Sequence, residues 1–123
     1  KGSMALRIIL KKIVGEKCSS IDDGEKVLDL IRPELMKGFM VELDFEGIKL
    51  VLTPFLNRCF GSLLELFGRE LIMTHVSMRN TSDELLQRIN NFINRKEEEF
   101  IQSRDRKTLQ EIFDEDGLVD SDL

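Results

Sequence analysis

Apolar residues recur along the chain in two rhythms, one typical of strands and the other typical of helices. Short apolar runs predict strands at residues 6–10 and 40–45, and a shorter strand at 48–52. Apolar residues spaced three and four apart predict helices at about residues 22–37, 53–67 and 81–93. Strands that alternate with helices predict an α/β fold, with a small, mostly parallel or mixed sheet of about four strands covered by helices.

The boundaries between these elements are less regular. Residues 15–22 are polar and predict a loop, whereas residues 71–78 combine a helical first half with a second half that alternates as a strand does. Capping-box spacing predicts helix starts at residues 22–25 and 81–84. Pro33 lies late in the first of these helices, and we expect it to kink or end that helix.

Residues 40–67 contain a strand, a turn and the beginning of a helix in immediate succession. Gly47 is the turn residue after the strand. Thr53 is in the position of an N-cap, where a hydroxyl accepts a backbone N–H, and Pro54 is in the first helical position. Because α/β domains place ligands at helix entrances that follow buried strands, we expect this entrance to be functional.

The same residues resemble a known family. The resemblance lies in Leu43-Asp44-Phe45-Glu46-Gly47, then Thr53-Pro54-Phe55, and then Phe60-Gly61. This pattern is similar to that of the STAS-like domains, relatives of anti-sigma-factor antagonists and of the cytosolic tails of sulfate transporters. It looks most like a bacterial branch described as a STAS-like domain of unknown function, over about residues 25–94. The resemblance implies a STAS-like fold and a non-enzymatic, regulatory protein-interaction module.

The resemblance also implies where a partner would bind. Related domains bind histidine-kinase-type ATPases or anti-sigma-like proteins at the entrance of the helix after the central strand. In this chain that surface would contain Asp44, Glu46, Thr53, Phe55, Asn57 and Arg58. Thr53 would be the phosphoacceptor that gates docking, and the alternative is that Thr53 only caps the helix. The antagonists carry Asp-Ser-Ser/Thr-Gly here, so in this chain the acidic residue is absent and threonine replaces serine.

Asp44, Glu46 and His75 suggest a second function, that of a small enzyme or ligand-binding domain. Paired carboxylates can transfer protons or bind a metal, but this function requires the three side chains to converge in one cleft. The alternative is a polar strand end and a structural histidine. Cys59 has the spacing of a small core residue. We expect no metal or cofactor, because the sequence lacks phosphate-binding glycine loops and zinc-spaced cysteine and histidine sets.

The chain becomes strongly charged beyond residue 94. We expect a domain at residues 4–94 and a charged helical extension with an acidic tail at residues 95–123, and residues 1–3 resemble a remnant of an expression vector. One interpretation of the extension is a helix that overruns the domain and frays. The other is a helix that docks on a partner or forms a homodimer through Phe100, Ile101, Leu109, Ile112 and Phe113.

Charge and composition narrow the classes of partner. Residues 108–123 contain six acidic residues and no basic residue, while the rest of the chain is nearly balanced. This distribution, and the absence of Trp and Tyr, argue against nucleic-acid binding. No apolar run is long enough to cross a membrane, so we expect no membrane partner and a cytoplasmic location. A disulfide between Cys18 and Cys59 is not expected there.

Overall fold

The computed structural model describes the backbone of residues 5–116 and the side chains of residues 6–104. The elements are β1 (Ala5–Ile9), α1 (Leu10–Val14), β2 (Lys17–Cys18), α2 (Ile21–Met36), β3 (Met40–Asp44), β4 (Leu50–Val51), α3 (Thr53–Leu56), the π-helical turn η1 (Asn57–Gly61), α4 (Ser62–Phe67), α5 (Arg69–His75), β5 (Val76–Arg79) and α6 (Asp83–Asp116).

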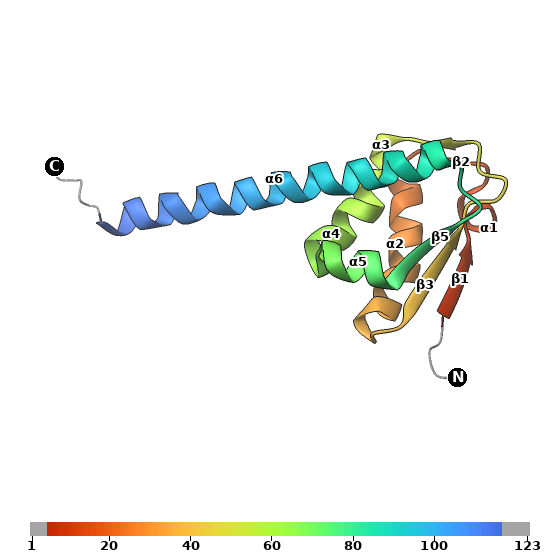
Figure 1. Cartoon of the computed structure of the whole chain (residues 1–123), viewed down its shortest axis with the longest axis horizontal. Helices are drawn as coiled ribbons and strands as arrows, with labels where there is room; N and C mark the ends of the chain where they lie inside the picture. The colour runs from red at the N-terminus through yellow and green to blue at the C-terminus, as the bar shows by residue number, and fades with distance from the viewer. Residues whose placement is uncertain (1–4, 117–123) are drawn as a thin grey trace.

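The main sheet consists of three parallel strands in the order β1-β3-β5. Leu43, on the central strand, pairs with Ile8 on β1 and with Met78 on β5. Ile8 and Leu43 are buried because α2, α4 and α5 lie against this face of the sheet (Figure 1). The sequence therefore predicted a helix-covered parallel sheet correctly.

A second, smaller sheet pairs β2 with β4, also in parallel. Residues 5–116 thus contain five strands in two sheets, rather than about four in one. The sequence does not predict β2, because Lys17 and Cys18 lie in a polar segment typical of a loop, and it does not predict α1, because Leu10 continues the apolar run of the first strand. Both Leu10 and Cys18 have no exposed surface, so tertiary packing determined these short elements.

Helix α2 begins two residues earlier than the capping pattern predicted. Ser20 is the N-cap: its Oγ accepts a hydrogen bond from the Asp23 backbone N–H at 3.0 Å, and the Asp23 carboxylate accepts from the Ser20 N–H in return. Pro33 lies inside the helix, which continues to Met36 and is followed by Gly38 at a φ of 83°. The expected break at Pro33 therefore occurs one turn later, at a residue that tolerates positive φ.

The segment after β4 forms one winding helical path made of α3, η1 and α4. Its N-cap is Leu52, and Thr53 is the first helical residue, so the N-cap role predicted for the Thr53 hydroxyl is wrong. After Gly68, residues 69–75 form α5 and residues 76–79 form β5. This division resolves the mixed pattern at residues 71–78 into a helix followed by a strand.

Helix α6 is the longest element and runs across the helical layer before it leaves the body of the molecule (Figure 1). Its start is capped by Ser82, whose Oγ accepts a hydrogen bond from the Leu85 N–H at 3.0 Å, rather than by Thr81. Ile89, Phe92 and Ile93 are buried as expected, whereas Leu86 is 37% exposed. Phe100 packs against the core, and Ile101 is exposed. Leu109, Ile112 and Phe113 lie beyond the described side chains.

Candidate functional site

The entrance of α3 packs against the first turn of α2. At Gly24 a side chain is excluded, because a Cβ there would lie 2.7 Å from the Cβ of Arg58 and 2.9 Å from the Phe55 carbonyl oxygen. These distances are shorter than ordinary van der Waals contacts, so only glycine allows the two helices to come this close. Gly24 therefore sets the position of the α3 entrance relative to α2.

An ion pair crosses the same contact. The Arg58 Nε donates to the Glu25 carboxylate, and this hydrogen bond lowers the pKa of Glu25 below its ordinary value. Both side chains remain more than 40% exposed, so water screens the pair and it contributes little to stability. The pair instead fixes the direction of the Arg58 side chain at the edge of the entrance.

A shallow surface hollow of about 540 Å³ lies where these helices meet, and we call it the α2–α3 junction. It is lined by Ile21, Thr53, Pro54, Asn57 and Arg58. Ile21 is 60% exposed, and Leu52, next to Thr53, is 38% exposed. The α2–α3 junction thus presents a large apolar side chain to solvent beside polar groups that can donate and accept hydrogen bonds.

The structure brings together three of the six residues predicted for partner binding. Thr53, Asn57 and Arg58 line the α2–α3 junction, and all three are exposed. Phe55 is only 1% exposed and belongs to the core, so it is not part of this surface. Sequence reasoning missed Ile21, Gly24 and Glu25. A glycine in the first turn of a predicted helix was the available signal, because glycine is unfavourable there unless a close approach requires it.

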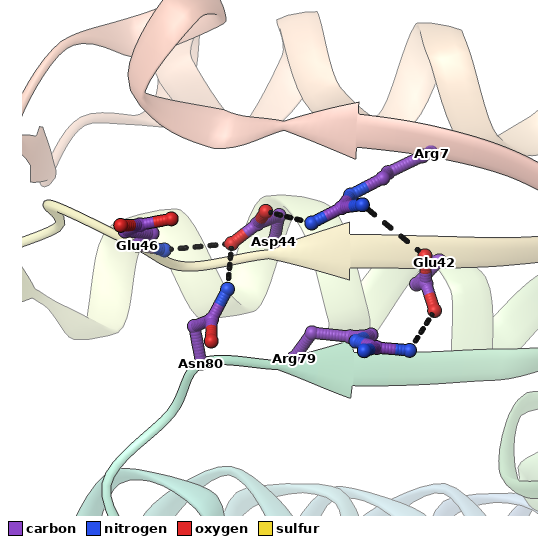
Figure 2. Close-up of polar contacts among 6 residues, drawn as sticks. All are labelled: Arg7, Glu42, Asp44, Glu46, Arg79 and Asn80. Carbon is purple, nitrogen blue, oxygen red and sulfur yellow. Dashed lines mark hydrogen bonds and ion pairs between the residues drawn. The ribbon is translucent and has the colours of Figure 1, made fainter.

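Asp44, predicted for the same surface, is instead part of a closed polar cluster at the end of β3 (Figure 2). Its carboxylate accepts hydrogen bonds from Arg7 Nη2 at 2.7 Å, Asn80 Nδ2 at 2.8 Å and the Glu46 backbone N–H at 2.9 Å. The donors from Asn80, Glu46 and Arg7 together lower the pKa of Asp44 to about 2. Because its pKa is this low, Asp44 stays ionised at neutral pH although only 2% of it is exposed. Its hydrogen bonds connect β1 and the residue after β5 to β3.

The cluster extends along the face of the sheet that lies away from the helices. Glu42 accepts a hydrogen bond from Arg79 Nη1 at 2.8 Å, and its carboxylate lies 3.8 Å from Arg7 Nε (Figure 2). Glu42 is thus held between the two outer strands. Asn80 adopts a φ of 61°, a conformation that Asn tolerates better than most residues, and this turns its side chain toward Asp44. These ion pairs and hydrogen bonds hold the three strands together.

The structure does not assemble the cleft predicted around Asp44, Glu46 and His75. His75 precedes β5, whose first residue Val76 pairs with Val41, whereas Asp44 pairs with Arg79 at the other end. His75 and Asp44 are therefore separated by four residues along the strands, roughly 13 Å. The His75 Nδ1 lies 2.8 Å from the Thr74 hydroxyl, and Glu46 is exposed, with only its backbone N–H bonded to Asp44.

Both cysteines are free and buried. Burial raises the pKa of Cys18 to about 12 and raises the pKa of Cys59 further still, so neither thiol forms the reactive thiolate at neutral pH. Cys59 packs as the small core residue that its spacing predicted. Among the side chains of residues 6–104, no group of three or more His, Cys, Asp or Glu residues could hold a metal ion.

The part of the chain that contains Asp44 and the residues lining the α2–α3 junction, except Ile21, matches a family. A model of the STAS-like domains of unknown function matches residues 23–86, from the first turn of α2 to the start of α6. The chain belongs to this family. The STAS-like core therefore includes the central strand, the α3 entrance and β5, while β1 and most of α6 lie outside the match. No curated protein and no solved structure matches the chain.

None of the helices within residues 5–116 is sufficiently long and apolar to span a membrane.

Proposed function

We propose that this STAS-like domain is a non-enzymatic regulatory module that binds another protein through the α2–α3 junction. The exposure of Ile21 at the rim of this hollow is the observation that carries the proposal. A monomeric surface gains nothing from a large apolar side chain in water, whereas a docked partner would bury it with a favourable free energy of about 1.5–3 kcal/mol. Thr53, Asn57 and Arg58 supply hydrogen-bonding groups around it.

The rival function, a small enzyme that uses Asp44, Glu46 and His75, lacks this support. The Asp44 carboxylate is already occupied by three donors, and His75 lies at the other end of the strand. A general base must be within hydrogen-bonding reach of its substrate, and a buried, fully paired carboxylate is not.

Phosphorylation of Thr53 is the regulatory step that this proposal includes. The Thr53 residue is exposed at the first turn of the helical path formed by α3, η1 and α4, and Arg58 lines the same hollow. A phosphate would add nearly two negative charges beside the exposed Ile21. We expect the added charge to release a partner whose contact surface is apolar or acidic.

The proposed partner is a histidine-kinase-type ATPase or an anti-sigma-like protein, the class that the resemblance to anti-sigma-factor antagonists implies. The test begins with affinity capture from a lysate of the source organism, and each captured protein is then purified and titrated against the domain by calorimetry. Ile21→Asp is compared with Leu66→Asp, because Leu66 is 54% exposed on α4, outside the junction.

The expected result is a loss of affinity of tenfold or more with Ile21→Asp and with Thr53→Glu, and little change with Leu66→Asp or Thr53→Val. Thermal unfolding of each variant checks that the fold survives. If Leu66→Asp weakens binding as much as Ile21→Asp does, the α2–α3 junction is not the docking surface. If Thr53→Glu binds as tightly as the wild type, the phosphorylation step is wrong and the docking proposal can still stand.

A further inference from the structure

Thr53 lies between two hollows of the surface. One is the α2–α3 junction, and the other, about 390 Å³ in volume, lies between α3 and the first half of α6, so we call it the α3–α6 groove. Figure 1 shows α3 beside this part of α6. The groove is lined by Thr53, Leu56, Glu84, Gln87, Arg88, Asn91, Phe92 and Arg95. A group attached to the Thr53 hydroxyl can therefore enter either hollow.

The two hollows differ in the state of the arginines that line them. At the α2–α3 junction, the Arg58 guanidinium already donates to the Glu25 carboxylate. In the α3–α6 groove, neither Arg88 nor Arg95 forms an ion pair with any side chain of residues 6–104, although Glu84 lines the same groove. The groove therefore contains two positive charges that no described carboxylate neutralises by direct contact.

Arg88 is the better placed of these two arginines. It lines the α3–α6 groove and also a neighbouring hollow of about 240 Å³ that is lined by residues 48–51. These residues lead through β4 into Thr53. Arg95 lies seven residues farther along α6, roughly 10 Å at 1.5 Å per residue, and its guanidinium is over the Phe92 ring, 5.8 Å from the ring centre. Arg88 is thus the arginine beside the chain segment that ends at Thr53.

Phosphorylation converts Thr53 into a group that an unpaired arginine recognises. The Thr53 Oγ attacks the γ-phosphorus of a nucleoside triphosphate held by the proposed kinase-type partner. The Oγ–P bond forms as the bond to the nucleoside diphosphate breaks, and a base on the partner takes the hydroxyl proton. The product carries nearly two negative charges and three acceptor oxygens. A guanidinium binds such oxygens through two parallel N–H donors.

We infer that Arg88 binds the phosphate of phosphorylated Thr53 across the α3–α6 groove and thereby ties α3 to α6. The inference rests on the phosphorylation step of the proposed function and names the group that holds the phosphate. Because the phosphate is covalently attached to Thr53, its local concentration beside Arg88 is high, and an exposed arginine is sufficient. Arg95 adds positive charge farther along the groove. The phosphate stays at the border of the α2–α3 junction, where its charge still opposes a docked partner.

Melting curves of four full-length chains test this contact. The chains are the unmodified protein and the protein with phosphothreonine at position 53, each with and without Arg88→Gln. The phosphothreonine is incorporated during translation by a suppressor tRNA, so no kinase is needed. Arg88→Gln should lower the Tm of the phosphorylated chain by roughly 4 °C more than that of the unmodified chain, because only the phosphorylated chain loses a charge-assisted hydrogen bond. Equal losses in the two backgrounds would overturn the inference.

Arg58→Gln is the matched control for the side on which the phosphate binds. It removes an exposed arginine from the other hollow that Thr53 lines. Its effect on the Tm should be the same in the unmodified and the phosphorylated chains. A phosphorylation-dependent loss with Arg58→Gln and none with Arg88→Gln would put the phosphate in the α2–α3 junction and would overturn the inference.

The second pKa of the phosphate gives an independent readout that a purely structural role of Arg88 would not change. Pairing with a cation favours the dianion, so phosphorus NMR should give a second pKa below the ordinary value of about 6. Arg88→Gln should return this pKa toward about 6, whereas Arg58→Gln should leave it low. A pKa that is the same in the wild type and in Arg88→Gln contradicts the inference.

Neither measurement involves a partner, so the inference and the proposed function fail separately. If the phosphate contact is found but the phosphorylated chain binds its partner as tightly as the unmodified chain, gated release is wrong and the inference stands. If phosphorylation releases the partner but the Tm and the pKa do not depend on Arg88, the inference is wrong and the proposed function stands.

Discussion

The carboxyl end of β3 and the α2–α3 junction are close in sequence but differ in how their polar groups are used. At the end of β3, Asp44 accepts three hydrogen bonds and is almost completely buried. At the α2–α3 junction, Thr53 and Asn57 are exposed beside the protruding Ile21. Asp44, whose carboxylate is the more reactive group, thus has a structural role. The less reactive side chains of Thr53 and Asn57 form the open surface. A residue type indicates function only when its hydrogen-bonding capacity is left for a ligand.

The largest effect should come from removal of the Asp44 carboxylate. Asp44→Leu leaves the donors on Arg7, Asn80 and Glu46 without their acceptor, and the cost of unpaired buried groups exceeds the gain from a new apolar side chain. We expect the Tm at neutral pH to fall by roughly 10 °C. Calorimetric or circular-dichroism melting measures this. A variant as stable as the wild type would show that the polar cluster around Asp44 does not hold the strands together.

The second-largest loss of stability should come from disturbing the helix contact that forms the α2–α3 junction. Gly24→Ala should destabilise the fold by about 1–3 kcal/mol, because the new methyl group overlaps the Arg58 Cβ and the Phe55 carbonyl. Gly61→Ala is the matched control, since a Cβ there meets its nearest atom, the Leu56 carbonyl oxygen, at an ordinary 3.9 Å. We expect Gly61→Ala to be neutral or stabilising by up to ~1 kcal/mol. Urea unfolding compares the two, and equal costs would mean that the close approach at Gly24 is unimportant.

Acid should weaken the end of β3 by protonating Asp44. The folded-state pKa of Asp44, about 2, lies below the unfolded value of about 3.9, so its stabilising contribution is complete above pH ~5 and is lost as the pH falls toward 2. Asp44→Asn should be less stable at neutral pH and should show a shallower loss of stability between pH ~5 and 2. Glu46→Gln, an exposed carboxylate two residues along, is the control. Chemical unfolding at a series of pH values measures this loss of stability. If Asp44→Asn loses stability between pH ~5 and 2 as steeply as the wild type does, Asp44 is not the carboxylate responsible.

The smallest effect on stability should come from Arg58→Gln at the α2–α3 junction. Its ion pair with Glu25 is screened by water, so the Tm should change by no more than about 2 °C. Arg7→Gln, which removes a donor from the buried Asp44, should lower the Tm by more than that. Parallel melting curves of the two variants give the comparison, and a larger drop for Arg58→Gln would reverse our account of the two regions.

Local sequence signals were sufficient for the longer elements. The apolar run at 40–45, the Gly47 turn and the helical spacing after Pro54 each correspond to an observed element, and Gly47 has the positive φ that its turn requires. The extension of α6 into a long charged helix was also readable from its composition. The capping residues were each misplaced by one or two positions. At α2 and α6 the reason is that several Ser, Thr and Asp residues near a helix start can accept the same N–H groups, whereas α3 begins after Leu52 without a side-chain cap.

Sequence alone determined the order of the longer strands and helices, their amphipathic faces and the family, because these depend on spacing and on short motifs. Only the tertiary structure decided which polar residues have their hydrogen-bonding groups satisfied inside the fold. It placed Arg7 and Asn80, 37 residues before and 36 after Asp44, around one carboxylate, and it placed Ile21 beside Thr53 through the close approach at Gly24. These groups meet because chain segments distant in sequence pack together, and no local pattern records which donors and apolar side chains will become neighbours.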